Sequence, residues 1–423
     1  MAYPASITTL IDKTDGPDQI IYAAHINAIH TALRDLNTIL GNAPQGNKTA
    51  IEDRLDIRID DDGNLKNPQQ LVTVGKSNAD YTTITAALAA ITDAASDKIY
   101  TVLVYPGIYT EAVTLKNYVN IIAVDKNSSQ IKNGITDGGA EVNSVVSIKI
   151  KPPGAIGVQT THANSNMTIL NDIISTGNLC ARCTAGTQTI YGNCINTGSS
   201  FSAVECSGGT QTIYGNCSAK GDTTVNCTGG TQTIYGNCSN TLIAKAVACG
   251  STGIQTIYGN CSAIGAIGAQ CYSGTQTIYG NCSSTNSVGA KCQDGTQTIN
   301  GDCTSTGATG ALCSGGTQTI NGNCTGKSNT YGAAGITGGT QIIRNAKIYS
   351  TLNESNGHAY AIKGNGVPIL HNCRLICTHA DAYAIYASVA RNITCMSVWA
   401  NRDDHANITQ LIADGFIFNA NVQ

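Results

Sequence analysis

The stretch that decides the fold is Gly186-Thr-Gln-Thr-Ile-Tyr-Gly-Asn-Cys194, because close copies of it recur at a nearly constant spacing. Each copy begins 21 or 23 residues after the one before it. Self-similarity with a period of ~20 to 50 residues is the signature of a solenoid, in which every repeat packs only on its neighbours. The copies begin at Gly186, Gly209, Gly230, Gly253, Gly274, Gly295, Gly316 and Gly339.

The length of the repeat and its residue pattern indicate which kind of solenoid this is. A coil of this length accommodates short strands separated by bends, since a strand advances ~3.3 Å per residue and no helical periodicity occurs inside the repeat. We therefore expect a mainly β chain that forms a parallel β-helix of about fourteen rungs, ~65 Å long at the usual strand spacing. Apolar residues that extend the array beyond the regular copies are Val102, Ile122, Ile148, Ile169, Ile343, Leu370, Ile393 and Ile417.

Alternation along a strand predicts which side chains enter the core. If Ile190 points inward, so does Gln188, whereas Thr187, Thr189 and Tyr191 point outward. A glutamine stands at this inward position in all eight copies. We favour a buried ladder of amide hydrogen bonds over an exposed row, because a buried amide without partners is costly.

Eighteen cysteines could indicate a disulfide framework, but fourteen of them fall on two columns that keep the repeat spacing. Such regularity favours reduced thiols packed in the core, where a free cysteine behaves as a small hydrophobe. Cys180-Ala-Arg-Cys183 is a single C-x-x-C pair without a second pair at zinc spacing. The sequence therefore predicts no metal and no cofactor.

Composition excludes several functional classes. Lys and Arg number 24 and Asp and Glu 27, which gives a net charge of −3, and only 12% of residues are charged. A chain without a basic stripe is a poor partner for nucleic acid or for an anionic membrane. No secretory signal is recognisable, and no apolar run reaches the ~20 residues of a membrane span, so we expect no membrane insertion.

The chain divides into an N-terminal module, a linker and the solenoid. Residues 1–66 are expected to be helical, with a seam spaced 3, 4, 3, 4 that allows a three-stranded coiled coil. The alternative is one amphipathic helix that packs within its own domain. Residues 67–98 are expected to form a linker and a capping helix, and residues 99–423 the β-helix, regular over 177–343 and irregular over 344–423. The seam consists of Ile26, Ile29, Leu33, Leu36 and Leu40.

The capping helix is predicted from Asp80-Tyr-Thr-Thr-Ile. Asp80 or Thr82 is the expected N-cap, and Ile84, Leu88 and Ile91 form the apolar face. A polar-capped helix at the open end of a solenoid prevents end-to-end association.

Outward-pointing tyrosines are the most regular surface feature. Ordinary cross-rung packing explains such a row, and this interpretation is favoured. A glycan-binding strip is the functional alternative. The flat threonine rows beside it also suggest ice binding, which the bulky tyrosines disfavour. The tyrosines are Tyr191, Tyr214, Tyr235, Tyr258 and Tyr279.

Candidate catalytic residues lie in the last coils, at Asp381, Asp403, Asp404 and His405. Asp381 and Asp403 are about one coil apart, and paired carboxylates suit glycoside hydrolysis. A solvated polar bend is the favoured alternative, so we do not predict an enzyme. If the chain is one, it is expected to be a polysaccharide depolymerase, either a glycoside hydrolase or a lyase.

Two resemblances add to these inferences. Asp80-Tyr-Thr-Thr-Ile84, Tyr100-Thr-Val-Leu-Val-Tyr-Pro-Gly-Ile-Tyr-Thr-Glu111 and Val119-Asn-Ile-Ile122 resemble the opening of pectin-lyase-like right-handed β-helices. The order of the modules resembles phage tail-fibre and tailspike proteins. Gly16-Pro-Asp-Gln-Ile-Ile-Tyr-Ala-Ala-His-Ile-Asn-Ala-Ile29 and Leu40-Gly-Asn-Ala-Pro-Gln-Gly46 are similar to virion-attached segments of phage structural proteins.

The second resemblance implies a homotrimer in the virion, assembled in the host cytoplasm and extracellular in the mature particle. Residues 1–66 would bind a phage tail or other virion protein, and the rod would meet host cell-surface polysaccharide. A polysaccharide depolymerase and a purely structural decoration spike are the alternatives.

Overall fold

The computed structural model describes residues 27, 29–31, 33, 70–242, 244–327, 333–350, 360–364, 366–377, 383–386, 394–396 and 399–400. The chain divides into two compact units, Met1–Leu71 and Val72–Gln423. In the first unit, Asn27, Ile29–Thr31 and Leu33 are helical, and the Thr31 hydroxyl donates to the Asn27 carbonyl at 2.9 Å. Ile29 is exposed. The other seam residues apart from Leu33 lie outside the described residues, so the coiled coil stays a prediction.

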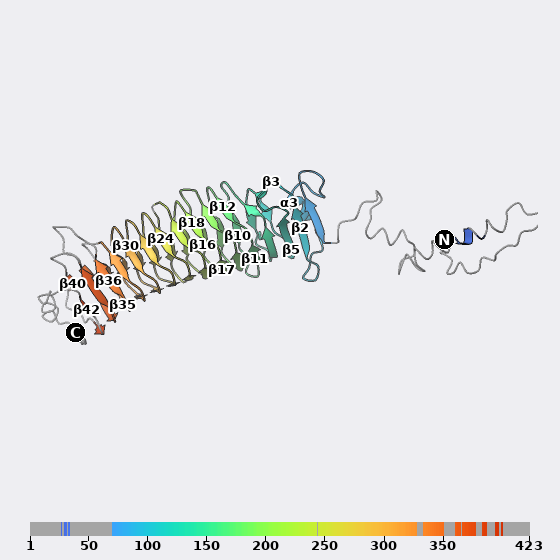
Figure 1. The fold of residues 1–423 in the computed structure, drawn as a ribbon. Helices are drawn as coiled ribbons and strands as arrows, with labels where there is room; N and C mark the ends of the chain where they lie inside the picture. Colours follow the sequence, from blue (N-terminus) through green and yellow to red (C-terminus); the bar gives the residue numbers. More distant parts are fainter. Residues whose placement is uncertain are drawn as a thin grey trace, which may run out of the picture. The chain divides into compact units, whose positions relative to one another are not determined.

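The second unit is a right-handed parallel β-solenoid, which confirms the predicted fold class (Figure 1). Each coil contributes one strand to each of three sheets, and strands stack along the axis with parallel neighbours. Sheet 1 comprises β1 (Leu71–Val74), β2 (Tyr100–Val104), β5 (Val119–Ala123), β8 (Asn143–Ser147), β11 (Asn166–Ile169), β14 (Thr187–Ile190), β17 (Thr210–Ile213), β20 (Thr231–Ile234), β23 (Ile254–Ile257), β26 (Thr275–Ile278), β29 (Thr296–Ile299), β32 (Thr317–Ile320), β35 (Thr340–Arg344), β38 (Val367–His371) and β41 (Thr394–Met396).

Sheet 2 follows sheet 1 along each coil. It comprises β3 (Gly107–Tyr109), β6 (Ser129–Ile131), β9 (Lys149–Ile150), β12 (Ile173–Ser175), β15 (Cys194–Asn196), β18 (Cys217–Ala219), β21 (Cys238–Asn240), β24 (Cys261–Ala263), β27 (Cys282–Ser284), β30 (Cys303–Ser305), β33 (Cys324–Gly326), β36 (Lys347–Ser350), β39 (Arg374–Cys377) and β42 (Trp399–Ala400).

Sheet 3 completes the coil. It comprises β4 (Val113–Thr114), β7 (Ile135–Thr136), β10 (Val158–Thr160), β13 (Ala181–Cys183), β16 (Val204–Cys206), β19 (Val225–Cys227), β22 (Val247–Cys249), β25 (Ala269–Cys271), β28 (Ala290–Cys292), β31 (Ala311–Cys313), β34 (Ala334–Ile336), β37 (Tyr360–Gly364) and β40 (Tyr383–Tyr386).

Strands β2 to β34 close about 11 turns, fewer than the about fourteen rungs expected. The expectation counted rungs at Ile393 and Ile417, and both residues lie outside the described part of the chain. Strands β35 to β42 continue the same three sheets beyond those turns.

Register within sheet 1 matches the expected pairing at both edges of the regular copies. Ile169 pairs with Ile190, and Ile343 pairs with Leu370. The expected pairing of Ile148 with Ile169 is wrong, because Val146 occupies that register and Ile148 lies in the bend between β8 and β9.

Two further register predictions are wrong for the same reason, that coil length varies outside the regular copies. The partner of Val146 on the preceding rung is Ile121, not Ile122. Leu370 pairs with Cys395, not with Ile393. Pattern matching by residue type misplaces a rung by one or two residues where bends differ in length.

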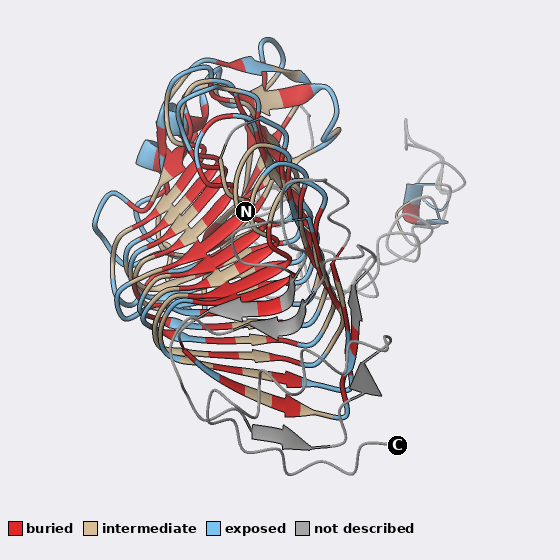
Figure 2. Ribbon diagram, turned by 90° about the vertical axis from the view of Figure 1, so that its left-hand side faces the viewer, coloured by how far each residue is buried: buried red, intermediate tan, exposed pale blue. Residues whose placement is uncertain are grey.

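The core is a continuous column of inward side chains, as alternation predicted. Ile190 and Gln188 are fully buried, whereas Tyr191 is exposed. In Figure 2 buried positions recur at matching places on successive strands, and exposed ones gather on the bends. Each fully buried isoleucine stabilises the fold by about 1.5–3 kcal/mol relative to an exposed one.

The predicted glutamine ladder is present in full. Each side-chain amide nitrogen donates to the amide oxygen of the glutamine one rung earlier, at 2.6–2.8 Å. At the N-terminal end, Gln188 Nε2 donates to Thr160 Oγ1 at 2.9 Å. All bonds run in one direction, so every amide between the ends acts as both donor and acceptor.

Both cysteine columns are buried free thiols, as expected. Hydrogen bonding with Cys206, followed by burial, raises the pKa of Cys227 to about 12. Hydrogen bonding with Cys271, followed by burial, raises the pKa of Cys292 to about 12 as well. Thiols with a raised pKa stay protonated at neutral pH and are poor nucleophiles.

Helix α3 (Ile84–Ala90) lies before β2 and buries Ile84, Ala87 and Leu88. Its N-cap is Thr83, whose hydroxyl accepts from Ala86 N, so the expected caps Asp80 and Thr82 are wrong. Asp80 instead accepts hydrogen bonds from the Thr73 backbone and hydroxyl.

Candidate functional site

Five tyrosines form one continuous stacked row at the end of the sheet 1 strands. Consecutive ring centroids lie 4.7–4.9 Å apart, and the ring planes differ by 2–7°. This spacing matches the strand separation in a sheet, because the in-register backbone holds each ring above the next. Each of the five tyrosine residues is 43–50% exposed, so the row is a surface feature of the rod.

Stacking decides which ring faces can receive a ligand. Tyr214, Tyr235 and Tyr258 have a neighbouring ring on both faces, so they present only their edges and hydroxyls. Only the two end rings have a neighbour of another type on one side: Leu170 precedes Tyr191 in the column, and Asn300 follows Tyr279. A sugar that contacts an aromatic face is therefore expected at these two ends, where the neighbouring side chain is smaller than a tyrosine ring.

Beyond Tyr279 the same column becomes polar. Asn300 and Asn321 follow in register, and Asn321 Nδ2 donates to Asn300 Oδ1 at 2.8 Å. The column continues with Arg344, which pairs with His371 on β38.

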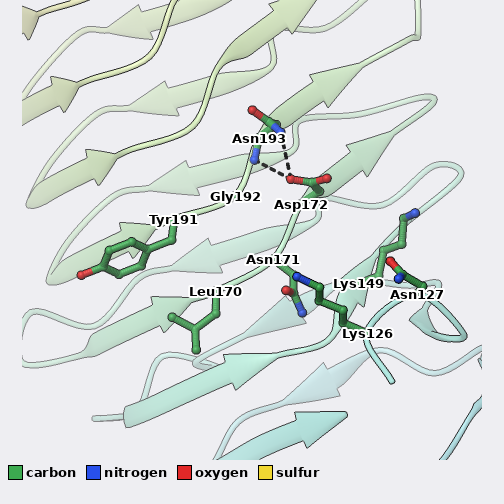
Figure 3. Close-up of a pocket in the computed structure, with 9 residues that line it drawn as sticks. All are labelled: Lys126, Asn127, Lys149, Leu170, Asn171, Asp172, Tyr191, Gly192 and Asn193. Atoms are coloured by element: carbon green, nitrogen blue, oxygen red, sulfur yellow. Dashed lines mark hydrogen bonds between the residues drawn. The ribbon is translucent and has the colours of Figure 1, made fainter. Parts of the chain in front are cut away.

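At the other end of the row, beside Tyr191, lies a polar cleft of about 300 Å³ (Figure 3). It occupies the corner between sheets 1 and 2 over four successive coils. Its lining residues are Lys126, Asn127, Lys149, Leu170, Asn171, Asp172, Tyr191, Gly192 and Asn193.

The cleft exists because one corner is longer than its neighbours. Ten positions separate Ile121 from Ile131, but only four separate Val146 from Ile150, their partners on the next coil. The longer corner places Lys126 on one side of the lining, and Tyr191 lies on the opposite side (Figure 3). The two shorter coils between them make the floor.

The projecting corner is held by its own hydrogen bonds. Asp125 Oδ1 accepts from Asn127 N at 2.9 Å, and its other oxygen accepts from the Ser128 hydroxyl. The Ser128 hydrogen bond, with that of Asn127, lowers the pKa of Asp125. Its carboxylate is therefore ionised and engaged within the corner itself.

The floor is fixed by an asparagine ladder along the same corner. Asp172 Oδ1 accepts from Asn193 N at 2.8 Å and from Asn193 Nδ2 at 3.1 Å (Figure 3). Asn193 Oδ1 in turn accepts from Asn216 N, and the pattern repeats on every coil to Asn323 and Lys347. Each side chain thus supplies the bend of the next coil with a hydrogen-bond acceptor.

Glycine is required beside this ladder. A Cβ on Gly192 would lie 2.2 Å from the Asn171 carbonyl carbon, since successive coils approach most closely there.

Polar groups in the cleft are mainly donors. Lys126 and Lys149 bring two ammonium groups from different coils, and Asp172 is the one carboxylate in the lining. The side-chain nitrogen of Asn171 is buried and has no hydrogen-bond partner among the described residues. Buried donors in proteins are nearly always paired, so an acceptor is the missing element.

Of the residues selected from sequence, the structure brings the five tyrosines together as one row. Asp381, Asp403, Asp404 and His405 lie outside the described residues. Apart from Tyr191, the cleft residues were not selected from sequence, although Ile122 and Ile148, two residues counted as successive rungs, are 26 positions apart, more than the 21 or 23 of the regular copies. Within the described ranges, no group of three or more metal-ligating side chains comes together, and no helix is long and apolar enough to cross a membrane.

Comparison with family models, with curated proteins and with solved structures finds no match for this chain. Any assignment of function consequently depends on the geometry of the site itself.

Proposed function

We propose that the chain is a fibre component of the phage tail-fibre or tailspike type, whose β-helical rod binds polysaccharide on the host cell surface. The observation that carries the proposal is the exposed tyrosine row that ends in a polar cleft. Rigid aromatic side chains offer binding area at little cost in conformational entropy, and their hydroxyls add hydrogen-bonding groups.

The solenoid itself supports a binding role. Every outward side chain of the row is held by in-register strands and by the ladders beneath it, so a ligand would meet a preorganised surface. A regular rod also repeats the same groups at a constant spacing, which suits a polymer made of repeating units.

In this proposal residues 1–66 attach the fibre to a virion protein and bundle three chains, and the rod extends outside the mature particle. The mass of the full-length chain in solution tests the bundling. A trimer is expected at micromolar concentration, and a monomer would contradict this part of the proposal.

Binding to bacterial cells tests the proposed function. Fluorescently labelled full-length chain is added to a panel of strains, before and after periodate oxidation of their surface sugars. We expect at least one strain to bind the chain and to lose that binding after periodate.

The double variant Tyr191→Ala/Tyr279→Ala removes both end rings of the row and should weaken cell binding by about tenfold, equivalent to ~1.4 kcal/mol. Tyr272→Ala, which lies away from the row and contacts Lys245, is the matched control and should bind normally. Binding that resists periodate in every strain, or no binding to any strain, would contradict the proposal.

A further inference from the structure

The cleft beside Tyr191 has a composition that selects among saccharides, and three observations bear on the selection. The first is charge. Lys126 and Lys149 face one cleft in a chain whose charged residues are sparse. The negative groups nearby are already engaged, Asp125 with Asn127 and Ser128 and Asp172 with Asn193.

The second observation is the direction of the hydrogen bonds that the cleft offers. An ammonium group has donors and no acceptor, and the buried amide nitrogen of Asn171 is a further donor without a partner in the described part of the chain. A neutral sugar hydroxyl can accept from such groups. A carboxylate accepts more strongly, because a charge-assisted hydrogen bond is about twice as strong as a neutral one.

The third observation is the apolar surface at one side. Leu170 and the ring of Tyr191 are both exposed and line the same cleft (Figure 3). An inorganic anion would leave this surface unused. A sugar ring has an apolar C–H face that can pack on the leucine and tyrosine side chains while its acidic group reaches the lysines.

We infer that this cleft binds an acidic sugar, a carboxylate-bearing unit of a polysaccharide, with Lys126 and Lys149 contacting the carboxylate and Tyr191 the ring. The inference rests on the proposed function and names its substrate class. A volume of about 300 Å³ is at the small end of ligand pockets, so the cleft holds a short segment of the polymer. The remaining units would extend along the tyrosine row.

Calorimetric titration of the full-length chain at low salt tests this inference. The probes are tetragalacturonate, a hyaluronan tetrasaccharide and trisialic acid, each beside its methyl ester, which keeps the ring but removes the charge. At least one acidic probe should bind, and its ester should bind at least about tenfold more weakly.

The double variant Lys126→Gln/Lys149→Gln should weaken binding of the acidic probe by about tenfold or more and leave binding of the ester unchanged. Lys220→Gln/Lys291→Gln makes the same charge change elsewhere on the rod and should alter affinity by less than about twofold. Lys126→Arg/Lys149→Arg should retain most of the affinity, because the charge is kept.

The outcomes separate this inference from the proposed function. If neutral saccharides bind and acidic ones bind no better, the inference is overturned and the fibre proposal stands. Displacement of the acidic probe by inorganic phosphate at equal concentration would show that the cleft binds any anion. That result would also overturn the acidic-sugar inference. If neither acidic nor neutral saccharides bind, the acidic-sugar inference and the proposed polysaccharide-binding function are both wrong.

Discussion

Gln341 lies directly opposite Pro368 on the next strand of sheet 1, and the chain of amide hydrogen bonds ends between them. Gln341 Nε2 donates to Gln318 Oε1 at 2.7 Å, but its own Oε1 is buried without a partner among the described residues. Proline has no side-chain donor, so it leaves that oxygen unsatisfied. The position marks the boundary between the regular repeats and the coils that follow.

Replacing Pro368 with glutamine should extend the ladder by one bond. We expect a stabilisation of about 1 kcal/mol, the usual net value of one added hydrogen bond. This stabilisation would appear as slower hydrogen exchange in residues 366–377 and as a higher unfolding temperature than that of the parent chain. Pro368→Leu restores the backbone N–H without the amide and serves as the control, and an equal gain from leucine would contradict the explanation.

Breaking the ladder in its middle should cost more than breaking it at its end. Gln276→Leu leaves the oxygen of Gln255 and the nitrogen of Gln297 without a partner, and a loss of about 3 kcal/mol is expected from two unpaired buried groups. Gln341→Leu merely moves the unpaired oxygen to Gln318, so about 1 kcal/mol should be lost. Chemical denaturation measures both, and equal losses would argue against a cooperative ladder.

Much of this architecture could be predicted from sequence, and the reason is physical. Gln188 and Ile190 alternate with outward-pointing threonines, and a fixed repeat brings each copy into register with the next, so inward and outward sides follow directly. The error at Ile148 arose where a corner changes length, because residue type does not reveal where a strand ends. The cleft depends on that same change of length at Lys126, and its residues come from four coils with no shared motif.

Alkaline pH should destabilise the rod through its buried thiols. An unfolded thiol ionises near pH ~8.5, whereas the pKa values of Cys227 and Cys292 are raised to about 12 in the folded chain. Above pH ~8.5 the unfolded state therefore loses protons that the folded state keeps, and stability falls as pH rises toward 12.

We expect each such thiol to remove about 1 kcal/mol per pH unit over this window. Unfolding temperatures measured between pH 7 and 10.5 check the trend. Cys292→Ala should lower stability at pH 7 but flatten the alkaline decline. An unfolding temperature that does not change over this range would contradict reduced, buried thiols.

Low pH should also destabilise the rod, through protonation of the Asp137 carboxylate. Burial raises the pKa of this carboxylate, but hydrogen bonds from the Thr161 hydroxyl and from the backbone of His162, Thr161 and Gly139 outweigh it, so its pKa lies below the usual value. Its contribution is present above pH ~4 and is lost as pH falls through the lowered folded pKa.

Asp137→Asn turns an amide N–H toward groups that already donate, so we expect a loss of about 2 kcal/mol at pH 7. The variant should also show a weaker stability difference between pH 7 and pH 3 than the parent chain. Circular dichroism during heating at both pH values measures this. A variant as stable as the parent at pH 7 would show that the carboxylate is dispensable.

The measurement that tests the central claim most directly is a structure of the full-length chain in complex with the tightest-binding saccharide. The account predicts density in the corner cleft, with a sugar ring against Tyr191 and an acidic group within hydrogen-bond distance of Lys126 or Lys149. Density confined to another part of the rod, with this cleft empty at saturating saccharide, would contradict it.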